Sequence, residues 1–68
     1  MENKNTIPAV DKSLKLLHVL AESSEAMTTA QLARGLEIAP TTCYRIIQTM
    51  VGHDWLRPTS TGAFTFSS

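Results

Sequence analysis

The stretch of residues 27–51 constrains this chain most, because its helix-start signals divide it into two short helices joined by a tight turn. Thr28 and Gln31 have the T-x-x-Q spacing of a capping box, in which two side chains satisfy free amides at the start of a helix. Pro40 has no amide to leave unsatisfied and therefore suits the first position of the second helix. This pattern predicts a helix-turn-helix over about residues 28–51.

The second of these helices, at about residues 40–51, is amphipathic. Its apolar residues recur at helical spacing and form one inward-facing stripe of Cys43, Ile46, Ile47, Met50 and Val51. The opposite face is polar and consists of Thr41, Arg45 and Gln48, with Thr42, Tyr44 and Thr49 on its flanks. Such groups can read base edges in a DNA major groove, which is wide enough to admit a helix. We therefore interpret this helix as a DNA recognition helix.

The residues after the motif predict a small β-hairpin. Gly52 is a natural helix stop, and strands are expected at about residues 55–57 and 63–67 around a loop at 58–62. Phe64 and Phe66 alternate with Thr65, which predicts both rings on the core face of the hairpin. The order helix, helix, helix, hairpin predicts a mainly α winged helix-turn-helix, with the wing at about residues 55–67. Candidates for DNA contact are Thr28, Thr41, Thr42, Tyr44, Arg45, Gln48 and, at the entrance to the wing, Arg57.

A first helix is expected from Val10 to about Glu22, and it is apolar over more than half of its surface. A seam at helical spacing, formed by Val10, Leu14, Leu17 and Ala21, is expected to face the core. Leu16, Val19 and Leu20 fall outside this seam, between it and a polar stripe of Asp11, Lys15, His18 and Glu22. We expect the three side chains outside the seam to pack against another copy or another part of the protein. The alternative is that the hairpin or the chain's own tail covers them.

Length and charge set limits on the partners. With 68 residues the chain forms one small domain, expected at residues 8–68 after a flexible arm at residues 1–7. Six basic and six acidic residues cancel, so the overall charge does not attract nucleic acid. Useful affinity for DNA would need locally placed basic groups or two copies acting together.

Several other classes of function find little support in the residues. One cysteine cannot form an internal disulfide, and neither a zinc-binding cluster nor an apolar run of membrane length is present. Cys43 lies on the apolar stripe, and His18 and His53 lack a paired carboxylate for acid-base catalysis. We therefore expect a cytoplasmic protein that is not an enzyme, with no cofactor, no metal and no membrane contact.

A protein-interaction module is the alternative function, because an exposed helix can also meet another protein. A protein-docking face is expected to carry aromatic and aliphatic anchors. On the polar face of the predicted recognition helix only Tyr44 is of that type, whereas Arg45 and Gln48 suit phosphates and base edges.

The chain resembles the N-terminal DNA-binding domain of the isocitrate lyase regulator (IclR) family over about residues 8–67. The most telling segments are V-D-K-S-L from Val10, L-A-R from Leu32, and T-C-Y-R-I-I-Q-T-M from Thr42. The resemblance implies a bacterial transcription regulator whose winged domain binds a palindromic operator on double-stranded DNA, as part of a dimer or tetramer. It also implies a small-molecule effector, bound by a further C-terminal domain that this chain lacks.

Two residues depart from the family pattern, which usually has glycine at both positions. Glu37 stands in the turn between the second and third helices, and Asp54 stands just before the wing. Both positions are expected to need a positive φ, which costs a residue with a side chain more than it costs glycine. A shift of the first turn toward Gly35 is the alternative.

Overall fold

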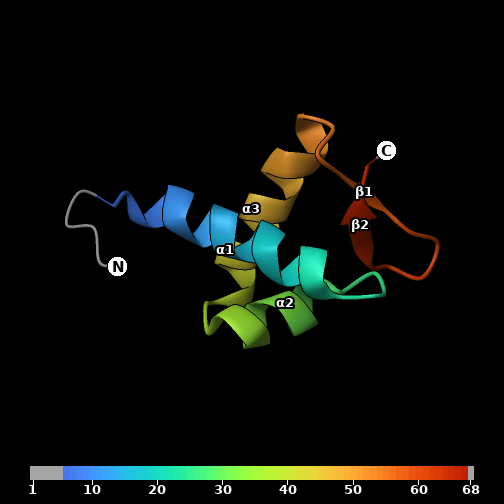
Figure 1. Ribbon diagram of the computed structural model, residues 1–68, viewed down its shortest axis with the longest axis horizontal. Coiled ribbons are helices and arrows are strands. Elements are labelled where there is room, and N and C mark those ends of the chain that lie inside the picture. Colours follow the sequence, from blue (N-terminus) through green and yellow to red (C-terminus); the bar gives the residue numbers. More distant parts are fainter. Residues whose placement is uncertain (1–5, 68) are drawn as a thin grey trace.

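The computed structural model describes residues 6–67 and has three helices followed by a two-stranded antiparallel hairpin (Figure 1). The helices are α1 (Pro8–Glu22), α2 (Thr29–Leu36) and α3 (Pro40–Gly52), and the strands are β1 (Leu56–Pro58) and β2 (Phe64–Phe66). This order confirms the predicted winged helix-turn-helix. Most of the arm predicted at residues 1–7 lies outside the described residues.

The start signals read from the sequence act as predicted. The backbone amide of Gln31 donates to Thr28 Oγ1 at 3.1 Å, and the backbone amide of Thr28 donates to Gln31 Oε1 at 2.9 Å. These two bonds complete the capping box of α2. Pro40 is the first residue of α3, after Ala39 in extended conformation.

The core lies where the three helices meet the hairpin. Leu32 and Ala33 of α2 belong to one buried cluster with Cys43 and Ile47 of α3, together with Leu16, Leu20, Leu56 and Phe64 from the other elements. Ala33 is only 3% exposed, and its small side chain allows α2 and α3 to lie close together.

The predicted core seam of α1 is wrong for Val10, Leu14 and Ala21, and only its Leu17 packs against the core. Leu16 and Leu20 are 0% and 3% exposed, whereas Val10 and Leu14 of the predicted seam are 51% and 61% exposed. Leu17 and Val19 pack at the edge of the core, on either side of the buried pair, and Ala21 is exposed. Both faces of α1 are apolar, so helical spacing alone did not distinguish them.

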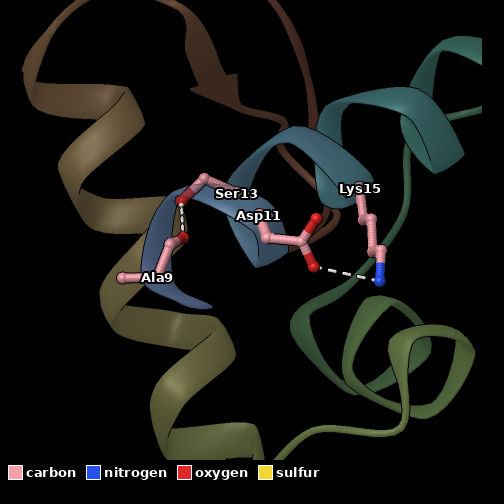
Figure 2. A network of polar contacts seen from close by, with 4 residues as sticks. All are labelled: Ala9, Asp11, Ser13 and Lys15. Atoms are coloured by element: carbon pink, nitrogen blue, oxygen red, sulfur yellow. Dashed lines mark hydrogen bonds and ion pairs between the residues drawn. The ribbon is translucent and has the colours of Figure 1, made fainter. Parts of the chain in front are cut away.

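The exposed apolar face is at the free end of α1. In Figure 1 the first turns of α1 reach beyond the region where α1 crosses α2 and α3. Ile7, Val10 and Leu14 lie at this free end, and we call these three residues the α1 stripe. Beside it, Lys15 Nζ lies 3.0 Å from Asp11 Oδ2, and the Ser13 hydroxyl donates to the Ala9 carbonyl (Figure 2).

The hairpin is shorter than predicted. Strand β1 pairs with β2 in the register Leu56 to Phe66, Arg57 to Thr65 and Pro58 to Phe64. Trp55, expected in the first strand, precedes it and is 60% exposed. The two phenylalanines also differ, because Phe64 is 9% exposed and joins the core, whereas Phe66 is 36% exposed and lies outside the core cluster. Phe66 thus shares the alternation that predicted both rings on the core face, but it lies outside the buried cluster.

A further pairing, missed in the sequence, ties the wing to α2. The Met27 amide donates to the Phe64 carbonyl at 3.1 Å, and the Phe64 amide donates to the Met27 carbonyl at 2.8 Å. Met27 immediately precedes Thr28, the N-cap of α2. The start of α2 and the second strand of the wing therefore share one anchor.

The corrected face of α1 gives a stability prediction. Leu16→Ala should destabilise the chain by about 2–5 kcal/mol, because it leaves a cavity in the core. Leu14→Ala, the matched control, should change the free energy of unfolding by no more than about 0.5 kcal/mol, because that side chain is largely exposed. Urea unfolding of both variants checks this. Equal losses would contradict the assignment of the core face.

Candidate nucleic-acid interface

Helix α3 exposes to solvent the residues that the sequence predicts to contact DNA. The side chains on its outer side are exposed, namely those of Thr41, Thr42, Tyr44, Arg45 and Gln48. Cys43 and Ile47, on the opposite side, are fully buried. The same packing that buries the apolar stripe thus brings the polar groups together on one accessible face.

The two candidate arginines are available for an external partner. Neither Arg45 nor Arg57 forms an ion pair with any residue in the range 6–67, and both are exposed. Asp54, the acidic residue nearest to Arg57 in the sequence, does not pair with it. The Thr49 hydroxyl, in contrast, already uses its proton within α3, because it donates to the backbone carbonyl of Arg45 at 2.8 Å.

Thr28 lies apart from α3, at the N-cap of α2, and is half-buried. Its hydroxyl accepts the Gln31 amide, so its proton remains to be donated. Amides at the start of a helix also favour anions. The site is therefore compatible with a phosphate but is first of all a structural cap.

The charge on this surface differs from that of the whole chain. Helix α3 contains one arginine and no acidic residue. Arg57 then lies on β1, and no acidic residue follows Asp54 in the chain. The chain is neutral overall, but helix α3 has no carboxylate of its own.

The turns at both ends of α3 have the backbone geometry expected for glycine positions. Glu37 has φ 57° and ψ 44°, and Asp54 has φ 64°. Gly35 lies within α2, so the turn has not shifted toward it. Glu37 and Asp54 therefore both adopt the left-handed conformation, which is unfavourable for a residue with a β-carbon.

Cys43 is a core residue. Burial raises the pKa of its thiol, which keeps it protonated and a poor nucleophile. Its Sγ lies 3.7 Å from the Thr29 carbonyl, so the thiol makes a weak contact across the α2–α3 interface.

A groove of about 470 Å³ runs between the free end of α1 and the flank of α3. It is lined by Val10 of the α1 stripe and by Ile46 and Met50, with Thr42 and Arg45 on its polar side. Spacing alone did not reveal this groove, although the sequence did show Val10 and Leu14 on one face.

Two other kinds of site are absent from the described part of the chain. Residues 6–67 contain no group of three or more His, Cys, Asp or Glu side chains that could hold a metal ion. No helix in that range has the length and hydrophobicity needed to cross a bilayer.

Residues 9–60 match the family described as the IclR helix-turn-helix domain. No curated protein sequence matches the chain. Among solved structures, the chain is similar to the repressor BlcR of Agobacterium tumefaciens (TM-score 0.82, 23% identity, covering 94% of this chain and 26% of that one). It is also similar to an IclR family transcriptional regulator of Brucella abortus (TM-score 0.85, 17% identity, covering 96% and 25%). The chain thus spans about a quarter of the length of each.

The left-handed turn gives a prediction about stability. Glu37→Gly should stabilise the chain by about 0.5–1 kcal/mol, because glycine adopts this φ without steric cost although it loses more entropy on folding. Glu37→Ala is the control, since it removes the carboxylate but keeps a β-carbon at positive φ. Thermal unfolding should show a gain for glycine alone, and an equal gain for alanine would point to charge as the cause.

Proposed function

Because the chain belongs to the IclR helix-turn-helix domain family, we propose that it binds double-stranded DNA sequence-specifically as the DNA-binding domain of a bacterial transcription regulator. The observation that carries this proposal is the outer face of α3, which is polar, exposed and free of carboxylates, and whose guanidinium forms no ion pair with residues 6–67. Such a face supplies the hydrogen-bonding groups that base edges and phosphates require.

In this proposal α3 lies in the major groove with its outer face toward the bases. Arg45 can donate two hydrogen bonds to guanine, and Gln48 can pair with adenine, because their planar groups match those edges. Thr41 and Thr42, in the first turn of α3, offer hydroxyls to bases or to nearby phosphates. Tyr44 adds an exposed ring and a phenol on the flank.

The groups outside α3 fit contacts to the DNA backbone. Arg57 lies on β1, the strand that leads into the wing, where a guanidinium can pair with a phosphate. Thr28 can donate its remaining hydroxyl proton near the start of α2. Contacts of this type position a protein on DNA without reading its sequence.

A protein-interaction module without DNA binding is the competing function. It would use the same exposed α3, but Tyr44 is the single large hydrophobic residue of α3 that is strongly exposed. Hot spots in protein interfaces are usually well-packed aromatic or arginine anchors in desolvated pockets. The polar character of this face therefore favours DNA.

Two copies are proposed to act together on a palindromic operator, as a dimer or within a tetramer. We assign the contact between the copies to the α1 stripe and not to the face of Leu16 and Leu20 predicted from the sequence, because those two leucines are buried. The stripe borders the groove beside α3 through Val10, and the Asp11–Lys15 ion pair lies next to it. An apolar patch with a charged rim suits a two-fold contact with a second copy.

This contact should be weak in the isolated chain. Three exposed side chains bury far less than the roughly 1,200–2,000 Å² of a stable interface. Binding to two half-sites, about one helical turn apart, would make the second binding event intramolecular and raise the overall affinity.

The regulatory partner is proposed to bind elsewhere in a longer protein. The chain spans about a quarter of the two regulators compared above, and a small-molecule effector would act through a further C-terminal domain. Release or capture of DNA would then depend on that domain.

The two arginines give a paired test of DNA recognition. The probes are a duplex enriched from a random-sequence library by the wild-type chain and a scrambled duplex of equal composition. Arg45→Ala should weaken binding to the enriched duplex by about tenfold, and binding to the scrambled duplex far less, because a base contact is lost. Arg57→Ala removes the same charge but should weaken both duplexes alike and lower the salt slope by about one unit.

Each arginine serves as the control for the other. Unchanged affinity of Arg45→Ala for both duplexes would end its proposed role, and a changed base preference in Arg57→Ala would show that the wing residue reads sequence. A wild-type chain that enriches no duplex would favour the protein-interaction alternative.

The α1 stripe has its own test. The double variant Val10→Ser/Leu14→Ser should lose the two-copy complex on a duplex with inverted half-sites, as followed by sedimentation. Binding to a single half-site is the internal control and should stay within about twofold of wild type, because one copy does not use the stripe. Retention of the two-copy complex would show that α1 is not the contact.

A further inference from the structure

The wing tip, residues 59–63, is held by hydrogen bonds that converge on Thr59. Its amide donates to the Ala63 carbonyl at 2.8 Å, and its carbonyl accepts the Gly62 amide at 3.2 Å. Its hydroxyl oxygen accepts the Ala63 amide at 3.2 Å and the Thr61 amide at 3.4 Å, and lies 3.0 Å from the Thr61 hydroxyl. One residue thus closes the loop through both its backbone and its side chain.

This hub connects the exposed tip to the buried part of the domain. Ser60, Thr61 and Gly62 are exposed, Thr59 is half-buried, and Ala63 is 5% exposed. Gly62 has φ 83°, a conformation that other residues rarely adopt. A loop of hydroxyl residues and glycine would otherwise sample many conformations, so the Thr59 bonds restrict the tip.

The direction of the hydroxyl–hydroxyl bond follows from counting lone pairs. A hydroxyl oxygen has two acceptor positions and one proton. The two amides of Thr61 and Ala63 occupy both acceptor positions of Thr59 Oγ1. This arrangement favours Thr59 as the donor to Thr61 Oγ1, which leaves the Thr61 proton for another partner.

We propose that Thr59 is the positioning residue of the wing, and that it orients the Thr61 hydroxyl as a donor to a phosphate oxygen of the DNA backbone. This inference rests on the proposed DNA binding and assigns a role in it to the loop beyond Arg57. An orientation fixed before binding reduces the ordering cost that a loose loop would incur on contact. The partner is a phosphate, since a threonine hydroxyl on the wing is a suitable donor to the DNA backbone.

The test compares Thr59→Val, Thr59→Ser and Thr61→Val with Thr65→Val as the matched control. Thr65 belongs to the same hairpin, on β2 outside the loop, and its hydroxyl bonds to none of residues 6–67. Binding is measured on the enriched and scrambled duplexes over a range of salt concentrations. Amide exchange at Thr61 and Ala63 reports the loop without DNA.

Thr59→Val and Thr61→Val should each weaken binding to both duplexes by about three- to tenfold, as expected when one or two net hydrogen bonds are lost. The double variant Thr59→Val/Thr61→Val should lose affinity by a factor much smaller than the product of the two single losses, because both changes remove the same contact. Thr59→Ser should restore binding to within about twofold, and Thr65→Val should bind as wild type does. Exchange at Ala63 should quicken in Thr59→Val but not in Thr59→Ser.

Three results would overturn the proposal. The first is wild-type affinity in Thr61→Val, a variant that keeps the Thr59 hydroxyl. The second is a loss of affinity in the double variant that equals the product of the two single losses. The third is failure of Thr59→Ser to restore binding. Absence of wild-type binding to every duplex would instead refute the DNA-binding function itself. The wild-type measurement therefore separates the two failures.

Discussion

The close packing of α2 against α3 is the contact on which the rest of the domain depends. Leu32 and Ala33 meet Cys43 and Ile47 with almost no exposed surface. A larger residue at Ala33 would push α3 away, because cores at native density have no room for added methylenes. The direction of the polar face of α3 is therefore set by buried residues that touch no partner.

The wing is joined to this pair of helices at several separate points. Met27 bonds to Phe64 on one side of β2, and the Trp55 amide donates to the Met50 carbonyl at 2.9 Å at the end of α3. Leu56 places β1 in the common core. Helix α2, helix α3 and the wing are therefore held in one arrangement, which is what a surface that reads a duplex requires.

The electrostatics favour specificity over non-specific attraction. Helix α3 carries no acidic residue, Glu37 and Asp54 lie just outside its two ends, and the overall charge is zero. Long-range attraction to phosphates is weak in such a chain, so binding would depend on hydrogen bonds made at close range and on a second copy. The left-handed Glu37 and Asp54 carry a conformational cost at both ends of α3, in a domain small enough for that cost to matter.

The local features of this domain could be predicted from neighbouring residues alone. The capping box at Thr28, the start of α3 at Pro40 and the single apolar stripe of α3 depend on neighbouring residues and a helical period, so they could be read directly. The positive φ at Glu37 and Asp54 followed from the family resemblance. The polar face of α3, and hence most of the candidate site, came from the same short-range rules.

Long-range packing, in contrast, settles which face of α1 is buried, where the hairpin leaves the core and how the wing is anchored. Helix α1 is apolar on opposite sides, so its period fits two orientations, and contact with the rest of the core selects Leu16 and Leu20 over Val10 and Leu14. Phe66 shares the period of Phe64 but lies beyond the limit of a small core. Met27 pairs with Phe64, a partner distant in the sequence. Such long-range choices depend on which surfaces meet in space, and no local pattern encodes that.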